Sequence, residues 1–172
     1  IKGINLLQQS MVSGIIYVSM HDRKLGKLIN PVDLPIVYAY SYPPESNSYV
    51  TYDDYTSAKI MTEHLIELGH KDIGIICGFP ESFPTQTRLQ GIYKVFEDHN
   101  IKLRDEYVKY GDWEFKSGYE KAIELLSLRK RPTAIFALND IMASGCYSAI
   151  MKSNLRIPED ISVAGFDNRD IS

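Results

Sequence analysis

Polar and aromatic side chains follow directly after apolar runs at several points of this 172-residue sequence. The run 134–138 stops at Asn139, and the run 161–166 stops at Asp167. Amide and carboxylate groups form paired hydrogen bonds with neighbouring hydroxyls, and an arginine presents a rigid fork of donors to the same oxygens. An aromatic ring in such a place packs against the apolar C–H face of a sugar. These residue types therefore indicate a site for a polyhydroxylated ligand.

The candidate ligand-binding residues all lie near the end of a predicted strand: at its last residue, just after it, or shortly beyond it. They are Tyr40, Asp53, Phe79, Ser82, Arg88, Trp113, Asn139 and Asp167. Ligand clefts generally combine apolar walls with a few placed polar groups, and this set has that mixture. We expect the members to converge, although they lie far apart in the sequence.

Five of the candidates also have a purely structural alternative. Aspartate and asparagine favour helix N-caps and Asx turns, which are the alternatives for Asp53, Asn139 and Asp167. Arg88 could lie on a helix surface, and Trp113 could fill space in the core. Their joint occurrence at successive strand ends is what favours ligand binding.

The elements that must position these residues alternate between strand and helix. Apolar runs predict strands at 14–18, 36–40, 49–52, 73–77, 107–110, 134–138 and 161–166. Apolar residues at helical spacing predict helices around 58–68, 89–96, 119–126 and 143–150. The alternation predicts an α/β fold with parallel sheets, in which ligands bind outside the carboxyl ends of the strands.

Two lobes are expected, with a crossing near the Pro-rich stretch 43–48. Residues 1–51 are predicted to be the remaining part of an N-terminal lobe, and residues 52–172 to form the C-terminal lobe. Because the sequence begins within a predicted helix and ends just after a strand, we expect a fragment of a longer protein.

Composition and motifs argue against several classes of function. The formal net charge is −3, so a nucleic-acid-binding surface is not expected, and the basic run 129–131 is interpreted as the last turn of a helix. Cys77 and Cys146 lack metal spacing and fit buried thiols of a cytoplasmic protein. Nucleotide-binding, nucleophile-elbow and zinc-protease motifs are absent, and His70 is expected to form a structural hydrogen bond. We therefore expect no enzyme, cofactor, metal site or membrane span.

Seven short motifs follow one another along almost the whole chain. They are DDY at 53–55, HLIELGH at 64–70, RLQGI at 88–92, GDW at 111–113, PTAIFA at 132–137, NDIMA at 139–143 and IPEDISVAGFD at 157–167. In order and spacing this set resembles the effector-binding core of lactose/galactose-repressor (LacI/GalR) family transcription regulators.

The resemblance implies a periplasmic-binding-protein-like fold with two Rossmann-like lobes and a small sugar or sugar derivative between them. It also implies effector contacts for Arg88, Asn139, Asp167 and the aromatic Trp113. A homodimer is implied, with operator DNA bound through a headpiece that we expect to be absent from this chain. The effector would bias lobe closure and dimer geometry, and so DNA affinity.

Some sugar-binding members of that family carry an aspartate where this sequence has Tyr40. The resemblance predicts the ligand-sensing domain of a sugar-responsive repressor; the alternative is an extracytoplasmic sugar-binding protein of a transporter. The Gly-His turn at 69–70 and the segment Pro-Glu-Asp-Ile-Ser at 158–162, which precedes Gly165, favour the regulator. Replacement of Arg88 or Asp167 by alanine is expected to abolish sugar binding without unfolding the lobe.

Overall fold

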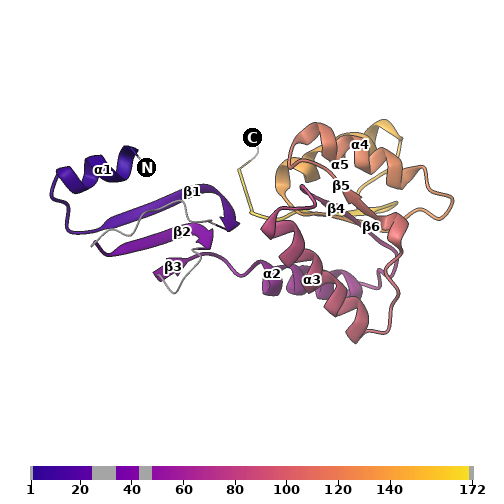
Figure 1. Ribbon diagram of the computed structural model, residues 1–172. Coiled ribbons are helices and arrows are strands. Elements are labelled where there is room, and N and C mark those ends of the chain that lie inside the picture. The colour runs from indigo at the N-terminus through magenta and orange to yellow at the C-terminus, as the bar shows by residue number, and fades with distance from the viewer. Residues whose placement is uncertain (1, 25–33, 43–47, 171–172) are drawn as a thin grey trace. The chain divides into compact units, whose positions relative to one another are not determined.

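The computed structural model describes residues 2–24, 34–42 and 48–170 and divides into two compact units, shown in Figure 1. The first unit is Ile1–Asp53 and the second is Asp54–Ser172. This division falls two residues after the boundary expected from the sequence. Each unit is built on its own parallel sheet, so the predicted α/β class with parallel sheets is confirmed.

The first unit carries a three-stranded sheet of order β1-β2-β3. Its elements are α1 (Lys2–Gln9), β1 (Ile15–Lys24), β2 (Ile36–Tyr42) and β3 (Ser48–Val50). Tyr17 pairs with Tyr38 in the β1–β2 register, and their rings lie 5.7 Å apart. Ile16 and Val18 on β1 remain 76% and 62% exposed, so the described part of this unit leaves one face of the sheet uncovered.

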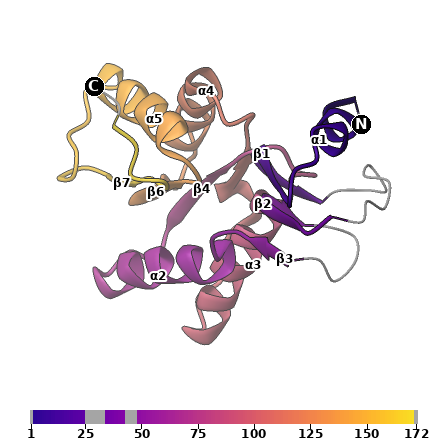
Figure 2. The same ribbon diagram turned by 90° about the vertical axis from the view of Figure 1, so that its left-hand side faces the viewer.

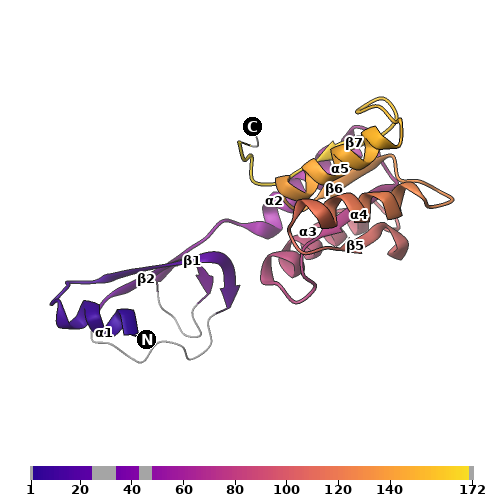
Figure 3. The same ribbon diagram turned by 90° about the horizontal axis from the view of Figure 1, so that it is seen from above.

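The second unit carries a four-stranded sheet of order β5-β4-β6-β7. Its elements are α2 (Asp54–Glu67), β4 (Ile73–Cys77), α3 (Phe83–Asp98), a short 3₁₀ helix (Asp105–Tyr107), β5 (Val108–Tyr110), α4 (Phe115–Leu126), β6 (Ala134–Ala137), α5 (Asp140–Lys152) and β7 (Ser162–Ala164). Figures 1 and 2 show α2 and α3 on one face of this sheet and α4 and α5 on the other. Figure 3 shows α4 and α5 side by side.

The strand order of the second unit creates a switch point beside β4. The chain runs from β4 to β5 on one side and then returns to β6 on the other side of β4. In open α/β sheets, ligands bind outside the carboxyl ends of the strands at the place where the order reverses. The carboxyl ends of β4 and β6 therefore mark the expected place for a ligand.

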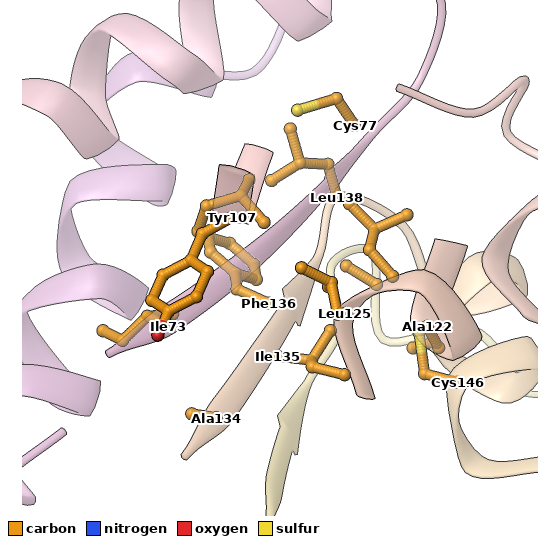
Figure 4. Packing of buried hydrophobic residues seen from close by; sticks show 14 of the residues in the cluster. Ile73, Cys77, Tyr107, Ala122, Leu125, Ala134, Ile135, Phe136, Leu138 and Cys146 are labelled. Carbon is orange, nitrogen blue, oxygen red and sulfur yellow. The ribbon is translucent and has the colours of Figure 1, made fainter. Parts of the chain in front are cut away.

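The core of the second unit is continuous through both faces of the sheet. Strands β4 and β6 are buried along their whole length, as expected for strands covered by helices on both sides. Figure 4 shows Ile135 beside Leu125, whereas Phe136 lies beside Tyr107. This alternation of side chains between the two faces follows the period of two in a β-strand.

Two local expectations have clear outcomes. The prediction that the basic run 129–131 ends a helix is wrong, because α4 ends at Leu126 and the following loop leads to the buried Pro132. Within that loop Lys130 pairs with Asp72, Nζ to Oδ2 at 2.7 Å. The structural role of His70 is confirmed, since its Nδ1 lies 2.9 Å from Thr133 Oγ1.

Candidate ligand-binding site

Arg88 forms a buried ion pair at the carboxyl edge of the second sheet. It lies on α3 with 3% of its surface exposed, and its Nε donates a hydrogen bond to Oδ1 of Asp54 at 2.6 Å. Its Nη1 donates to the backbone carbonyl of Leu138, the residue just after β6. Arg88 therefore connects the start of α2 with the end of a central strand and is not the surface residue that the alternative interpretation suggested.

Two aromatic rings lie over the Arg88 guanidinium. Its Cζ atom is 3.6 Å from the ring centroid of Phe166, which follows β7, and 5.6 Å from that of Trp113, which follows β5. A guanidinium attracts the negative faces of aromatic rings at such distances. Four segments that are distant in sequence thus contact one side chain.

Trp113 is held in a defined position by its surroundings. Its backbone has φ of 74°, and its indole ring lies so close to Gly78 that a Cβ atom there would be 1.8 Å from it. Asn139 donates from Nδ2 to the Trp113 carbonyl at 2.9 Å and accepts at Oδ1 from Met142 N at 2.8 Å. Asn139 is therefore the N-cap of α5, and it also fixes the loop that carries Trp113.

Asp167 lies in a strained turn after β7. Its φ is 107°, and the next residue, Asn168, also has positive φ at 53°. The turn begins at Gly165, where a Cβ atom would be 2.2 Å from Oδ1 of Asp140. Asp140 in turn accepts a hydrogen bond at Oδ2 from Arg169 N at 2.7 Å. Such strain in a residue other than glycine is typical of binding sites.

Burial raises the pKa of Asp167, the nearby Arg88 lowers it, and the negative charge of Asp140 raises it again. No hydrogen bond from the described part of the chain reaches its carboxylate. The group is therefore partly desolvated and available to a donor from outside the protein.

Ser82 and Phe79 come from the loop after β4. Ser82 is the N-cap of α3: its Oγ accepts from Thr85 N at 3.4 Å and donates to Thr85 Oγ1 at 2.9 Å. Phe79 is 46% exposed, as an aromatic wall of a binding site would be. Both residues lie at the carboxyl end of β4.

Asp53 and Tyr40 belong to the first unit. Asp53 is exposed and directly precedes α2, the position that its capping alternative requires. Tyr40 has φ of 54°, is 46% exposed, and lies 5.6 Å from the ring of Tyr52. Within the second unit, Arg88, Trp113, Asn139 and Asp167 lie close together, and Phe79 and Ser82 follow β4 at the same edge of the sheet. Asp53 and Tyr40 stay predictions from the sequence.

Sequence reasoning missed three residues that organise the site. They are Asp54, Phe166 and Asp140, and none of them is among the candidates named from the sequence. The signals were present, because two aspartates stand side by side at 53–54 and Phe166 lies between two motif residues. The partners of Asp54 and Phe166 were not predictable, since Arg88 is far away along the chain.

A shallow pocket of about 530 Å³ adjoins this group. It is lined by Ser57, Ile60, Met61, Asp140 and the turn 165–168. Within the described ranges, no three His, Cys, Asp or Glu side chains are grouped closely enough to hold a metal ion. Among the helices that the structure describes, none has the length and apolar character to span a bilayer.

Residues 62–172 match the family model described as "Periplasmic binding protein-like domain", which is more than half of the chain. The chain belongs to this family. Curated relatives named "HTH-type transcriptional repressor PurR" agree with this assignment. That of Actinobacillus pleuropneumoniae serotype 3 is 33% identical over 96% of this chain and 50% of its own length. That of Haemophilus influenzae (strain Rd) is 34% identical over the same shares. The chain thus spans about half the length of the curated relatives it matches.

Solved structures of LacI-family regulators are also similar to this chain. A LacI-family regulator from Rhizobium etli has a TM-score of 0.83 at 30% identity, covering 95% of this chain and 61% of that one. The ascG repressor of Escherichia coli has a TM-score of 0.84 at 28% identity, covering 98% and 62%. A CelR–cellobiose complex has a TM-score of 0.76 at 28% identity, covering 95% and 51%. The resemblance to LacI-family effector-binding cores is confirmed, and these relatives favour the regulator over the transporter protein.

Proposed function

We propose that the carboxyl edge of the β5-β4-β6-β7 sheet binds a small sugar or sugar derivative that controls a DNA-binding repressor. The observation that carries the proposal is the arrangement around Arg88. Its guanidinium is fixed by Asp54 and the Leu138 carbonyl, and Phe166 and Trp113 lie over it. This arrangement gives the edge a rigid frame, which lowers the entropic cost of binding.

Asp167 is the proposed polar anchor of this frame. Its carboxylate accepts hydrogen bonds only, so it suits the hydroxyl groups of a sugar. Asn139 already uses one hydrogen of its amide and one lone pair of its oxygen, but each of these groups can form a second bond. Phe79 and Trp113 supply apolar surface for the C–H face of the ring. Tyr40 and Asp53 stay predictions from the sequence.

The relatives support the class of ligand. The CelR relative was solved as a complex with cellobiose, and an Escherichia coli relative described as a sugar-binding transcriptional regulator was solved with phosphate. The curated relatives are transcriptional repressors. We infer that this chain acts in the same kind of protein, in the cytoplasm, and binds its ligand without catalysing a reaction on it.

The link to DNA is proposed for the whole protein. Operator DNA would be contacted by a headpiece outside these residues, and the effector would shift the population between two conformations with different DNA affinity. An effector can do so only by binding the two conformations with different free energies.

A homodimer is also proposed, formed through the outer surface of α4 and α5. Phe115, Tyr147 and Met151 on these helices are 46%, 44% and 68% exposed. Several large apolar side chains on two adjoining helices are more typical of an interface between subunits than of a solvated surface. Sedimentation of the full-length protein should give a dimer, and Met151→Glu should yield monomers. A monomeric wild type would contradict this proposal.

The effector proposal is tested with full-length protein and a panel of sugars and sugar phosphates. A ligand of the native state raises the melting temperature, and one that enters the site should change the emission of Trp113, the only tryptophan of this chain. The same ligand should change the affinity for operator DNA in a gel-shift assay. A panel without any stabilising member would contradict the proposal.

A further inference from the structure

Arg88 and Asp54 are the only charged residues that are buried within the described part of the chain. Their side chains are 3% and 0% exposed. An isolated charge at this depth would be strongly disfavoured, so each group compensates the other. The positive charge of Arg88 is thus already balanced before any ligand arrives.

Carboxylates and exposed cations share the edge around this pair, and Lys116, which is 86% exposed, acts on Asp112. Asp140, at the start of α5, and Asp167 lie close enough for the first to raise the pKa of the second. Asp112 stands beside Trp113, and its hydrogen bonds from Ser117 and from Glu114 N keep its pKa low. Arg169, which also acts on Asp167, is exposed. Apart from Arg88, which is already paired with Asp54, no cation in the described part of the chain is buried at this edge.

Helix N-termini at the same edge act in the opposite direction, because such ends attract anions. Four helices begin there: α2 at the Asp54 carboxylate itself, and α3, α4 and α5 after β4, β5 and β6. In α5, however, Asn139 caps the first turn and Asp140 already places a carboxylate there. In α3, Ser82 caps Thr85 N, and Pro84 has no backbone N–H to offer. The ends of α3 and α5 are therefore largely satisfied by the protein itself, whereas the N-cap of α4, Glu114, forms no side-chain cap hydrogen bond.

We propose that Asp54 is a positioning and specificity residue that makes the site select an uncharged polyhydroxylated ligand over its phosphorylated counterpart. It holds the guanidinium of Arg88 in place and cancels the charge that a phosphate group would need. This inference rests on the proposed function and names the ligand class of that same site.

The test measures affinities of full-length protein for three uncharged sugars (glucose, ribose and cellobiose), their terminal phosphate esters, and inorganic phosphate. For the sugar that binds best, the wild type should prefer the uncharged form at least tenfold, and it should not bind inorganic phosphate measurably. A preference for the phosphate ester would overturn the inference and leave the proposed function intact. If no member binds, the proposed function fails and the inference fails with it.

Three variants distinguish the effect of the Asp54 charge from the effect of its hydrogen bond to Arg88. Asp54→Asn keeps an acceptor for Arg88 Nε but removes the charge, so the preference for the uncharged ligand should fall at least tenfold. Asp54→Glu keeps the charge and should keep the preference. Asp105→Asn removes an exposed carboxylate from the 3₁₀ helix before β5 and should change nothing. A folded Asp54→Asn protein with an unchanged ratio of affinities would overturn the inference; if that variant does not fold, the wild-type ratio decides.

Discussion

The Nε atom of Arg88 donates a hydrogen bond to Oδ1 of Asp54 at 2.6 Å, and both side chains are almost inaccessible to water. This pair ties the first turn of α2 to α3 beneath the carboxyl edge of the sheet. Its geometry makes Arg88 a structural residue as well as a candidate ligand contact.

Replacing Arg88 by alanine should destabilise the protein strongly. The change would leave Asp54 buried without its counter-charge, and loss of one partner of a buried pair costs about 3–5 kcal/mol. Denaturant unfolding of the second unit should report this loss. The expectation from the sequence, that this variant loses binding without losing stability, is thereby revised.

Arg156 provides the matched control for that variant. It pairs with Asp160 at 3.0 Å, but its side chain is 71% exposed, so Arg156→Ala should have a much smaller effect on unfolding. Equal losses for the two arginine variants would show that burial of the Arg88 pair does not matter.

Gly78→Ala should displace the indole of Trp113. The added Cβ would lie 1.8 Å from the ring, so the ring must move, at a cost of about 1–3 kcal/mol for overpacking. Because Trp113 is the only tryptophan of this 172-residue chain, the emission maximum of the chain reports the movement.

Gly69→Ala is the control for this effect. Gly69 has φ of 94° and no neighbour near the position of an added Cβ, so the variant loses stability through backbone strain alone. Its emission maximum should equal that of the wild type. An unshifted maximum in Gly78→Ala would mean that the packing of Trp113 on Gly78 is not maintained in solution.

Asp167→Asn should stabilise the protein at neutral pH. Burial raises the folded-state pKa of this carboxyl above its unfolded value, so the folded state favours the protonated form. Stability from this group is present below the unfolded pKa and is lost as the pH rises through the folded pKa. The difference in melting temperature between variant and wild type should therefore be positive at pH 7.5 and shrink towards pH 4.

Asp160 should behave in the opposite way. Hydrogen bonds from the Arg156 side chain and backbone lower its pKa, so its contribution to stability is present at neutral pH and is lost as the pH falls. Asp160→Asn should lower the melting temperature at pH 7.5 and have less effect at pH 4. The same sign for both variants would contradict the assigned environments.

The two roles considered for Asn139, helix N-cap and ligand contact, can be tested separately. Asn139→Ala removes the acceptor for Met142 N and should cost about 1 kcal/mol or more. Asn139→Asp keeps that cap but loses the donor to the Trp113 carbonyl. If Asn139→Asp retains the stability and loses ligand affinity, the amide donates to the ligand or positions Trp113; if both are retained, Asn139 is a cap and nothing more.

The sequence predicted the elements of the second unit well, because its strands are short apolar runs between amphipathic helices. It also predicted which edge carries the candidate residues, since parallel strands all end at one side. The burial of Arg88 was not predictable, because its partner Asp54 lies 34 positions earlier and only packing of α2 on α3 brings them together. The basic run 129–131 was wrongly predicted to end a helix. The preference of cations for the C-terminal end of a helix dipole does not determine the residue at which the helix stops.

The central claim is that the edge carrying Asp167 binds the effector. The most direct measurement is calorimetric titration of full-length wild type, Asp167→Ala and Asp160→Ala with the sugar that the panel selects. A hydrogen bond to a charged group contributes about 1.5–3 kcal/mol, so Asp167→Ala should bind at least about tenfold more weakly. Asp160→Ala should match the wild type. Equal affinities of all three proteins would contradict the account.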